Sequence, residues 1–326
     1  MLFINLILVY ATLLTSTFLI SKKLEFYDKP NVRKIHKSNV FNTGGIIIYF
    51  FYLVVVNFFE LNNNIELIIS IGFFICLVGF IDDRINLKPS NKVIFIIIPS
   101  AYLILNGISL INLGYYEHIG FLNLGKFQLP FLILATGLLI NATNYIDGVD
   151  GLLLTFFICC LGYYIFLVED AKTIYLIKLL LIPAILNLIL NMLPSKSKFK
   201  FFSGNAGSLF VGFFISFLTI ELYNSFDIHP VYLIWPLWYP IYDFFFVSIN
   251  RAIIKKSIFS GDNSHLHHKI LIKFKKNHLN TILLFFVSNI SIIYFGFLIG
   301  NFSKLLSLIT FIFVFFLYLI LRFKYK

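Results

Sequence analysis

Long apolar stretches, separated by short polar segments, follow one another along the whole chain. An α-helix needs about 20 apolar residues to cross the hydrocarbon core of a bilayer. The fourth stretch carries Pro99, and the ninth carries Pro236, Pro240 and Asp243, so these two depart most from an uninterrupted helix. The pattern predicts an all-α polytopic membrane protein with about eleven transmembrane helices: residues 2–20, 44–60, 65–81, 92–107, 129–145, 151–168, 173–190, 207–224, 230–249, 280–299 and 304–321.

Composition supports a membrane protein and excludes a soluble one. Of the 326 residues, 59% are hydrophobic and 13% are charged, whereas soluble domains have about 25% charged residues. The three cysteines lie in apolar runs without metal-ligand spacing, so no disulfide or zinc site is expected. The start of the chain lacks a basic segment and a small-residue cleavage site, which favours a retained first span over a signal peptide. No inserted soluble domain or repeat interrupts the pattern, so residues 1–326 are predicted to form a single domain.

Basic residues indicate the orientation of these helices. With the N-terminus outside, 22 of the 26 Lys and Arg fall in the inner segments 21–43, 82–92, 146–150, 191–206, 250–279 and 322–326. Cytoplasmic loops of membrane proteins carry such an excess. We therefore expect the N-terminus outside and the C-terminus in the cytoplasm. The net charge of +11 then reflects orientation and anionic headgroups, and no nucleic-acid partner is needed. On the outer side, residues 107–128 are expected to form a small β-hairpin.

The polar segment 141–151 joins two apolar runs and is the most informative part of the sequence. It contains Asn141, Asn144, Asp147 and Asp150, with no Lys or Arg to neutralise the carboxylates. A simple polar turn uses the same residue types, but it does not require two carboxylates at this spacing. Carboxylates held together at a membrane boundary repel, and they need a proton, a cation or a positively charged partner. The segment therefore predicts a site for a divalent cation that carries a phosphorylated ligand.

Two further clusters lie on the same predicted cytoplasmic side. Asp82 and Asp83 end the third apolar stretch, and Lys92 begins the fourth, where it can neutralise a phosphate; the alternative is an interfacial charge cluster. Residues 204–208 (Gly-Asn-Ala-Gly-Ser) run into an apolar helix. Exposed backbone N–H groups at a helix start form an anion site, and Ser208 is an expected N-cap. A capped helix start without a ligand explains this second cluster nearly as well.

A histidine-rich segment follows the ninth apolar stretch. His265, His267 and His268 lie downstream of Arg251, and they are predicted to donate hydrogen bonds to phosphate or sugar oxygens. The carboxylates and amides elsewhere suit Mg²⁺ or Mn²⁺ better than zinc. A solvated histidine-rich loop is the alternative. Together, the clusters predict an active site at the cytoplasmic face, built from loops 21–43, 82–92, 141–151, 191–208 and 250–279.

In chain order, these motifs resemble those of the polyprenyl-phosphate N-acetylhexosamine-1-phosphate transferases of glycosyltransferase family 4. These enzymes start O-antigen, enterobacterial common antigen and teichoic-acid linkage synthesis. The His-x-His-His pattern is similar to that of the undecaprenyl-phosphate GlcNAc-1-phosphate transferase branch, whereas the peptidoglycan-precursor branch typically has three consecutive histidines. The shared motifs are Asp28-Lys-Pro-Asn through His36, Gly44-Gly45, Asp82-Asp83-Arg84 with Lys92, Asn141 through Gly151, Gly204 through Ser208, and Arg251 with Asp262 through His268.

The resemblance implies transfer of an N-acetyl-amino-sugar-1-phosphate from a UDP-sugar to polyprenyl (undecaprenyl) phosphate, with release of UMP and with Mg²⁺ or Mn²⁺ as cofactor. It places the enzyme in the bacterial inner membrane with the active site facing the cytoplasm, and it leaves a homodimer open. The implied catalytic residues are Asp82, Asp83, Asp147 and Asp150. The implied metal ligands are Asn144, Asp147 and Asn205. The implied substrate-binding residues are Lys92, Asn141, Asn144, Ser208, Arg251, His265, His267 and His268.

One departure from the family pattern keeps other functions in view. Asn205 stands where the family motif Gly-Asp-x-Gly-Ser has a metal-binding Asp, and an amide oxygen coordinates Mg²⁺ without charge. A low-activity or inactive paralogue that acts as a membrane scaffold is therefore one alternative. The peptidoglycan-precursor phospho-MurNAc-pentapeptide transferase is a second, and it differs in the nucleotide sugar consumed. A transporter would need polar residues along the middle of several spans, and the span centres here are nearly all Leu, Ile, Phe and Val.

Overall fold

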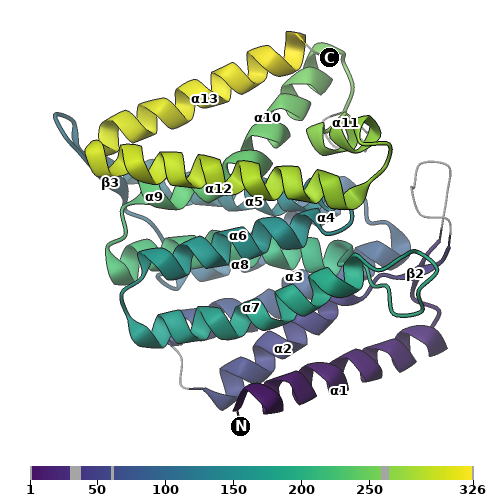
Figure 1. Ribbon diagram of the computed structural model, residues 1–326. Coiled ribbons are helices and arrows are strands. Elements are labelled where there is room, and N and C mark those ends of the chain that lie inside the picture. Colours follow the sequence, from purple (N-terminus) through teal and green to yellow (C-terminus); the bar gives the residue numbers. More distant parts are fainter. Residues whose placement is uncertain (1, 30–37, 60–61, 258–263, 325–326) are drawn as a thin grey trace.

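The computed structural model describes residues 2–29, 38–59, 62–257 and 264–324, and most of this chain is helical (Figure 1). Two short antiparallel strand pairs complete it. The helices are α1 (Leu2–Lys23), α2 (Gly44–Phe58), α3 (Asn63–Ile85), α4 (Pro89–Leu105), α5 (Gln128–Ile146), α6 (Leu152–Leu167), α7 (Ala171–Asn191), α8 (Gly204–Phe226), α9 (Pro230–Ile234), α10 (Trp238–Ile253), α11 (Leu266–Lys273), α12 (His278–Phe302) and α13 (Lys304–Lys324). The strands are β1 (Tyr27–Asp28), β2 (Val40–Phe41), β3 (Asn112–Tyr116) and β4 (Gly120–Asn123), and single 3₁₀ turns are η1 (Gly125–Phe127) and η2 (Trp235–Leu237).

Each of the eleven predicted apolar stretches is helical in the described residues. Among the described residues, seven helices are long and apolar enough to cross a membrane: α1, α3, α5 with η1, α7, α8, α12 and α13. Three others, α2, α4 and α6, are apolar but shorter. The ninth predicted stretch is divided into α9, η2 and α10 because Pro236 and Pro240 each remove a helical hydrogen bond. The chain is thus a multi-pass, all-helical membrane protein.

Helix α8 is the central element of the bundle. It packs against α2, α3, α5 and α6, and nearly all of its side chains are buried. In Figure 1, α1 lies at the lower edge of the stack and α13 at the upper edge, and both expose many large apolar side chains, as lipid-facing helices do. The central position of α8 brings its first residues into the middle of one end of the bundle.

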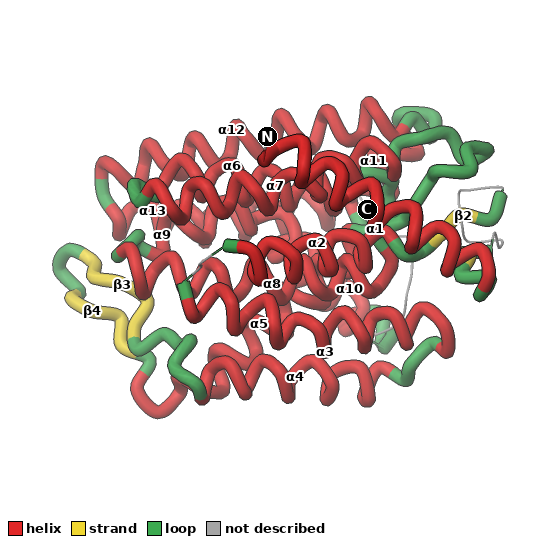
Figure 2. The backbone as a smooth tube through the Cα atoms, turned by 90° about the horizontal axis from the view of Figure 1, so that it is seen from below, coloured by secondary structure: helices red, strands yellow, loops and turns green. Residues whose placement is uncertain are grey.

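The two ends of the bundle differ, as Figure 2 shows. At one end, here called the hairpin end, β3 pairs with β4 in antiparallel register, with Asn112 opposite Asn123 and Tyr116 opposite Gly120. The hairpin predicted within residues 107–128 is therefore present. The opposite end, here called the site end, carries β1, β2 and α11. There, Phe202 N–H donates to Phe41 O at 2.8 Å and Gly44 N–H donates to Phe202 O at 2.9 Å, which fastens the first loop to the segment before α8.

Several predicted loop residues belong to helices instead. Helix α3 continues through Asp82 and Asp83 into its last turn. Helix α5 continues to Ile146, so only the second half of segment 141–151 is a loop. Helix α8 begins at Gly204 with Ser203 at the N-cap position. The predicted N-cap role of Ser208 is therefore wrong: this residue lies inside the helix, where its hydroxyl meets a neighbouring helix rather than its own N-terminus.

Buried polar groups fix the hairpin end. Glu221 on α8 is fully buried, and its two carboxylate oxygens accept hydrogen bonds from the side-chain amides of Asn62 and Asn64, each at 2.9 Å. Buried carboxylates are tolerated when hydrogen bonds satisfy them. This contact therefore ties the start of α3 to the end of α8 and sets the relative position of the two helices whose other ends meet at the site end.

Candidate active site

A polar cavity of about 710 Å³ opens at the site end. Its walls come from the end of α3, the end of α5 with the loop behind it, the segment before α8, helix α11 and the start of α12. Six residues predicted from the sequence line it: Asp83, Asn144, Asp147, Asp150, Asn205 and His268. Further lining residues belong to the predicted loops but were not named individually from the sequence; they include Asn42, Asn191, Phe202, Lys276 and His278.

Asp82 is a buried carboxylate with a full set of partners. Lys92, from the first turns of α4, donates from Nζ to Oδ2 at 2.9 Å. The side-chain amide of Asn205 also donates to Oδ2, at 2.8 Å, and the backbone N–H of Leu87 donates to Oδ1 at 2.9 Å. Lys92, which the sequence analysis expected to neutralise a phosphate, thus forms an ion pair with a carboxylate of the protein. Because three donors already satisfy Asp82, it is a poor candidate for accepting a proton from a substrate.

Asp83, the next residue, lies against the N-terminus of α8. The backbone N–H of Asn205 donates to both of its carboxylate oxygens, at 3.1 and 2.9 Å. The first N–H groups of a helix lack partners within the helix, and the N-terminus favours negative charge. Gly204 has φ of +68°, and a Cβ atom there would stand 2.6 Å from Asp83 Oδ2, so glycine is required for this approach. The predicted anion site at the start of α8 therefore holds a carboxylate of the protein itself.

Two amides link the carboxylates of α3 to helix α5. The side chain of Asn144 donates from Nδ2 to Asn205 Oδ1 at 2.7 Å and to Ser208 Oγ at 2.8 Å. Its own oxygen accepts from Lys92 Nζ at 3.3 Å. The structure thus brings the predicted residues Asn144, Asn205 and Ser208 into contact. Asn141 lies one turn away, and its amide donates to the backbone of its own helix at Gly137 O. Asn141 does not line the cavity.

Asp147 and Asp150, in the loop after α5, have different surroundings. Burial raises the pKa of Asp147 well above its usual range, and repulsion from Asp83, Asp150 and Asp28 adds to this effect. Asp150 instead forms an ion pair with Lys200, with 2.6 Å between Nζ and Oδ2. The ammonium group of Lys200 also donates to the carbonyls of Asn191 and Leu193, each at 2.8 Å. The segment itself has no basic residue, and of the three ways of balancing its carboxylates that the sequence left open, Asp150 has a positively charged partner, because folding brings Lys200 from a distant segment.

The four acidic residues thus fall into two classes. Asp82 and Asp150 each have a lysine partner, at 2.9 and 2.6 Å. Within the part of the chain that the structure describes, neither Asp83 nor Asp147 has a lysine or arginine in ion-pair contact, and Asp147 accepts no hydrogen bond. Both carboxylates are half-buried, and although Asp83 accepts hydrogen bonds from Asn205, neither has a counter-charge, which is costly for a group partly withdrawn from water. The two unpaired carboxylates line the same cavity, so their oxygens form a donor set that suits a hard divalent cation.

The histidine segment closes another side of the cavity, although Asp262 and the residues next to it, like His36 in the first loop, lie outside the described residues. His268 lines the cavity. His267 is fully buried; its Nδ1 lies 2.8 Å from the hydroxyl of Tyr239, and burial lowers its pKa well below the usual range. Atoms of both rings stand 2.6 to 3.2 Å from the point where a Cβ of Gly148 would be. The histidine segment is therefore packed directly on the loop that contains Asp147.

Arg251 and His265 lie behind this side, where both are buried and neither lines the cavity. Arg251, on the last turn of α10, is fully buried, with its guanidinium carbon 5.5 Å from the ring centroid of Tyr145. His265 Nδ1 lies 2.7 Å from Asp243 Oδ2. Asp243, His265 and His267 present three ligand-type atoms within 4.8 Å of one another. The direct hydrogen bond between Asp243 and His265 occupies the position that a metal ion would take, so the geometry is that of a hydrogen-bond network.

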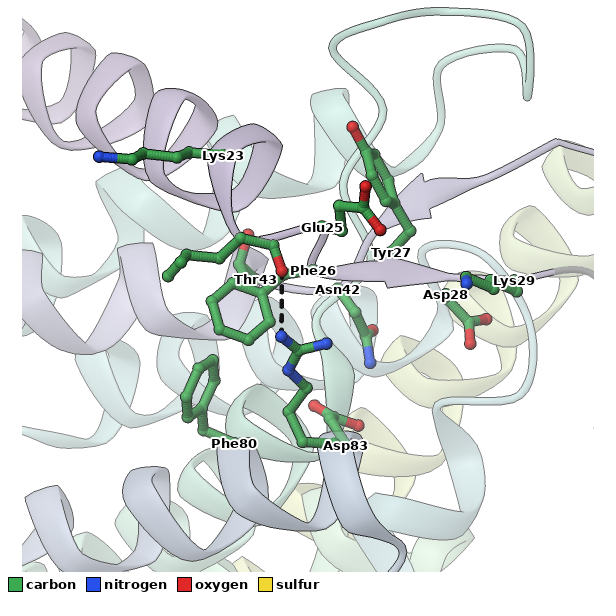
Figure 3. A pocket seen from close by; sticks show the side chains of 12 residues that line it. Lys23, Glu25, Phe26, Tyr27, Asp28, Lys29, Asn42, Thr43, Phe80 and Asp83 are labelled. Carbon is green, nitrogen blue, oxygen red and sulfur yellow. Dashed lines mark hydrogen bonds between the residues drawn. The ribbon is translucent and has the colours of Figure 1, made fainter.

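A second polar hollow, of about 450 Å³, adjoins the first near the end of α1 (Figure 3). Asp28, Asn42 and Asp83 line both hollows. Arg84 donates to the carbonyl of Leu24 at 3.0 Å, and its guanidinium carbon lies 4.2 Å from the ring centroid of Phe26. These contacts hold the segment between α1 and β1 against the end of α3, and they leave Asp83 accessible from two directions.

With this geometry in place, comparisons with known proteins identify the family. The family model described as glycosyl transferase family 4 matches residues 65–223. The chain belongs to glycosyl transferase family 4. It is therefore a transferase, and the matched segment includes Lys92 together with the four acidic residues and both amides described above. The histidine segment lies beyond the matched residues.

Curated relatives of this family 4 transferase cover most of its length. The undecaprenyl-phosphate alpha-N-acetylglucosaminyl 1-phosphate transferase of Escherichia coli (strain K12) is 27% identical over 263 residues, which is 77% of this chain and 71% of the relative. The protein of the same name from Yersinia pestis is 27% identical, covering 81% and 76%. A Bacillus subtilis (strain 168) protein named as a probable undecaprenyl-phosphate N-acetylglucosaminyl 1-phosphate transferase is 28% identical, covering 82% and 75%.

Proposed function

We propose that this family 4 transferase moves an N-acetyl-amino-sugar-1-phosphate from a UDP-sugar to undecaprenyl phosphate and releases UMP. The observation that carries the proposal is the pair of unpaired carboxylates, Asp83 and Asp147, in one polar cavity at the end of an apolar helix bundle. A transfer between a nucleotide sugar and a lipid phosphate needs a site of this kind at the membrane boundary. The names of the relatives support the choice of substrates.

The reaction proposed is a single displacement. An oxygen of the lipid phosphate attacks the phosphorus that carries the sugar, the bond from that phosphorus to the UMP oxygen breaks, and UMP leaves with the bonding electrons. When bound, Mg²⁺ or Mn²⁺ supplies charge stabilisation for the transferred phosphoryl group and for UMP. Asp83 and Asp147 are the residues that would hold this cation. Of the ligands expected from the sequence, Asp147 is kept, whereas the amide oxygens of Asn144 and Asn205 already accept hydrogen bonds from Lys92 and Asn144.

The chain's own side chains divide the remaining work. Lys92, whose ammonium group lies between Asp82 and Asn144, would hold the lipid phosphate. Asp83 is better placed than Asp82 to accept a proton from that phosphate, because the donors on Asp83 come from the backbone of Asn205 and leave the carboxylate facing the cavity. Arg251, His265, His267 and His268 would bind the diphosphate and the amino sugar. Asp150, held by Lys200, would help to seat the uridine.

We further propose that the site end faces the cytoplasm of a bacterial inner membrane and that the chain crosses the bilayer eleven times, with the N-terminus outside. The excess of basic residues in the loops of the site end supports this orientation. The three shorter apolar helices and the bent segment α9–α10 would be the additional spans. UDP-sugars are made in the cytoplasm, so the orientation and the donor agree. The product would start a cell-surface glycan of the O-antigen, common-antigen or teichoic-acid type.

The proposal is tested by measuring UMP release from purified protein in detergent. The assay contains undecaprenyl phosphate, Mg²⁺ or Mn²⁺, and one of several UDP-N-acetyl-hexosamines or UDP-MurNAc-pentapeptide. We expect release that requires the lipid and the cation, with at least a 100-fold loss, on the order of removing one charge-stabilising group, in Asp83→Asn. Asp227→Asn is the matched control, because Asp227 is exposed at the hairpin end in a left-handed conformation that Asn also adopts.

Each outcome separates the alternatives. The best donor names the substrate, and a preference for UDP-MurNAc-pentapeptide would assign the chain to the peptidoglycan branch instead. No release with any donor, combined with release by Asn205→Asp, would indicate a scaffold whose cation site has lost activity. Release that persists in Asp83→Asn would contradict the role given to the cavity.

A further inference from the structure

Asp243, which the sequence placed inside an apolar stretch, is a buried carboxylate on α10 with 1% of its surface exposed. Three donors converge on it. The imidazole of His265 lies 2.7 Å from Oδ2 through its Nδ1, whereas the hydroxyl of Tyr318 and the backbone N–H of Leu266 approach Oδ1 at 2.8 and 3.1 Å. Arg322 Nη2 stands 3.7 Å from Oδ1. Hydrogen bonds and nearby positive charge of this kind favour the ionised carboxylate.

An ionised carboxylate only accepts hydrogen bonds, so the hydrogen between Asp243 and His265 must sit on His265 Nδ1. Because the imidazole ring is rigid, this hydrogen bond at Nδ1 also restricts the direction in which the second nitrogen, Nε2, points. The His265 ring is also stacked with that of His267, with centroids 5.3 Å apart, and lies 5.3 Å from the ring of Tyr145. Its orientation is therefore determined on two sides, while Nε2 has no hydrogen-bond partner among the described residues.

The last helix of the chain supports this arrangement. Tyr318 and Arg322 both belong to α13, and Arg322 also donates to the carbonyl of Ser264 at 2.7 Å, directly before His265. The guanidinium carbon of Arg322 lies 4.3 Å from the ring centroid of Phe246 on α10. Helix α13 thus holds both the carboxylate and the backbone that precedes the histidine.

We propose that Asp243 is a positioning residue that fixes the tautomer and orientation of His265 so that Nε2 meets the phosphate oxygens of the substrate. This inference rests on the proposed function and names the residue through which one of its substrate-binding groups is held. A negative Asp243 also stabilises a second hydrogen on His265 when an anion arrives, which makes Nε2 a charged donor. Such charge-assisted hydrogen bonds are about twice as strong as neutral ones.

The kinetic test is a double-mutant cycle in the UMP-release assay. Asp243→Asn keeps the size and an acceptor oxygen but removes the charge, and we expect kcat to fall about 10- to 100-fold with the KM for undecaprenyl phosphate unchanged. Because Asp243 acts through His265, the double variant with His265→Asn should be no slower than His265→Asn alone. A multiplicative loss in the double variant would overturn the proposal, since it would mean that Asp243 acts on folding or on another group.

A matched variant separates positioning from general support. Tyr318→Phe removes a donor from Oδ1 of the same carboxylate but leaves the contact between Oδ2 and His265 in place. We expect it to lower kcat less than threefold, whereas a loss equal to that of Asp243→Asn would overturn the specific role of the His265 contact.

A second measurement decides the positioning without using activity. Protein labelled with ¹⁵N-histidine reports which ring nitrogen carries hydrogen, and the His265 signals are assigned by their loss in His265→Asn. We expect Nδ1 to carry the hydrogen in the wild type and to lose it in part in Asp243→Asn. An unchanged tautomer would overturn the proposal. If the wild type releases no UMP with any donor, the proposed function fails, while the spectra still decide whether Asp243 fixes His265.

Discussion

The ion pair between Lys200 and Asp150 should stabilise the wall of the cavity and should be detectable as coupling between the two residues. Lys200 is 2% exposed, and its three hydrogens are donated to Asp150, Asn191 O and Leu193 O. Asn191 in turn accepts a hydrogen bond from Gly151 N–H. One ammonium group therefore joins the loop after α5 to the segment that follows α7.

The expected magnitude follows from burial. Removing one partner of a buried ion pair costs about 3–5 kcal/mol, but the Asp150 side chain is 22% exposed, so part of its charge stays hydrated. For Lys200→Met we therefore expect a loss of about 2–3 kcal/mol after this discount. With an unfolding entropy of about 2.1 cal/mol/K per residue, this corresponds to a Tm lower by roughly 3–4 °C for a chain of this size.

The assay is a fluorescence-detected thermal scan in detergent at one fixed scan rate, since membrane proteins often unfold irreversibly. Asp150→Asn should lower Tm less than Lys200→Met, because Lys200 keeps its two carbonyl acceptors. The double variant should be more stable than the sum of the single losses predicts, by about 1–2 kcal/mol. Lys198→Met, an exposed lysine in the same segment, is the control and should shift Tm by less than about 1 °C. Additive losses, or a Lys200→Met protein as stable as the control, would refute the reasoning.

Three further predictions concern charge and buried polar groups. Burial raises the pKa of Asp147 in the folded protein, so the unfolded chain gives up this proton at a lower pH. In the presence of a chelator, the free energy of unfolding should therefore fall as the pH rises above the ordinary Asp pKa of about 3.9, until the raised pKa is passed. Asp147→Asn should therefore have a higher Tm than the wild type at pH 8 but not at pH 4. An equal difference in Tm at both pH values would contradict the ionisation of Asp147 as its cause. Glu221→Gln places an NH₂ group against the side-chain amide of Asn62 and should lower the free energy of unfolding by about 1–3 kcal/mol. UMP release by the folded protein should stay unchanged, because Glu221 lies at the hairpin end. Asn205→Asp replaces the amide that donates to Asp82 Oδ2 at 2.8 Å with a second negative charge. The Tm measured with chelator should therefore fall, and the increase in Tm on adding Mg²⁺ should become larger. An increase equal to that of the wild type would mean that the cation binds away from Asn205.

The fold could be predicted closely because lipid imposes a simple rule. Every backbone polar group in the bilayer must be satisfied inside its own segment, so a long apolar stretch becomes a helix. All eleven stretches are accordingly helical. The boundaries were less predictable where polar residues belong to helices, since Asp82 and Asp83 look like loop residues by composition. Each occupies the last turns of a helix because its partners on α4 and α8 satisfy it there.

The site was predicted unevenly for a physical reason. Spacing along one segment indicates which residues can share a neighbourhood, so Asp147 and Asp150 could be found in the sequence. Lys200, 50 residues further on, pairs with Asp150 at 2.6 Å, and no local pattern distinguishes it from Lys196 or Lys198. His278 had no visible partner, yet its Nδ1 accepts from the backbone N–H of Asp150 at 3.2 Å. Partners of this kind depend on how helices pack, and the sequence of one segment does not contain that information.

The distribution of charge around the cavity bears on how many cations it can hold. Lys92 and Lys200 neutralise Asp82 and Asp150, and Lys276 on the cavity wall offsets Asp28 in formal charge. Two negative charges remain, on Asp83 and Asp147. A single divalent cation would balance them, whereas a second would leave the site with excess positive charge before any substrate arrived. This balance favours one cation in the proposed reaction. The charge of the incoming diphosphate would then be met by Arg251 and the histidine segment, which contacts Asp243 and helix α13.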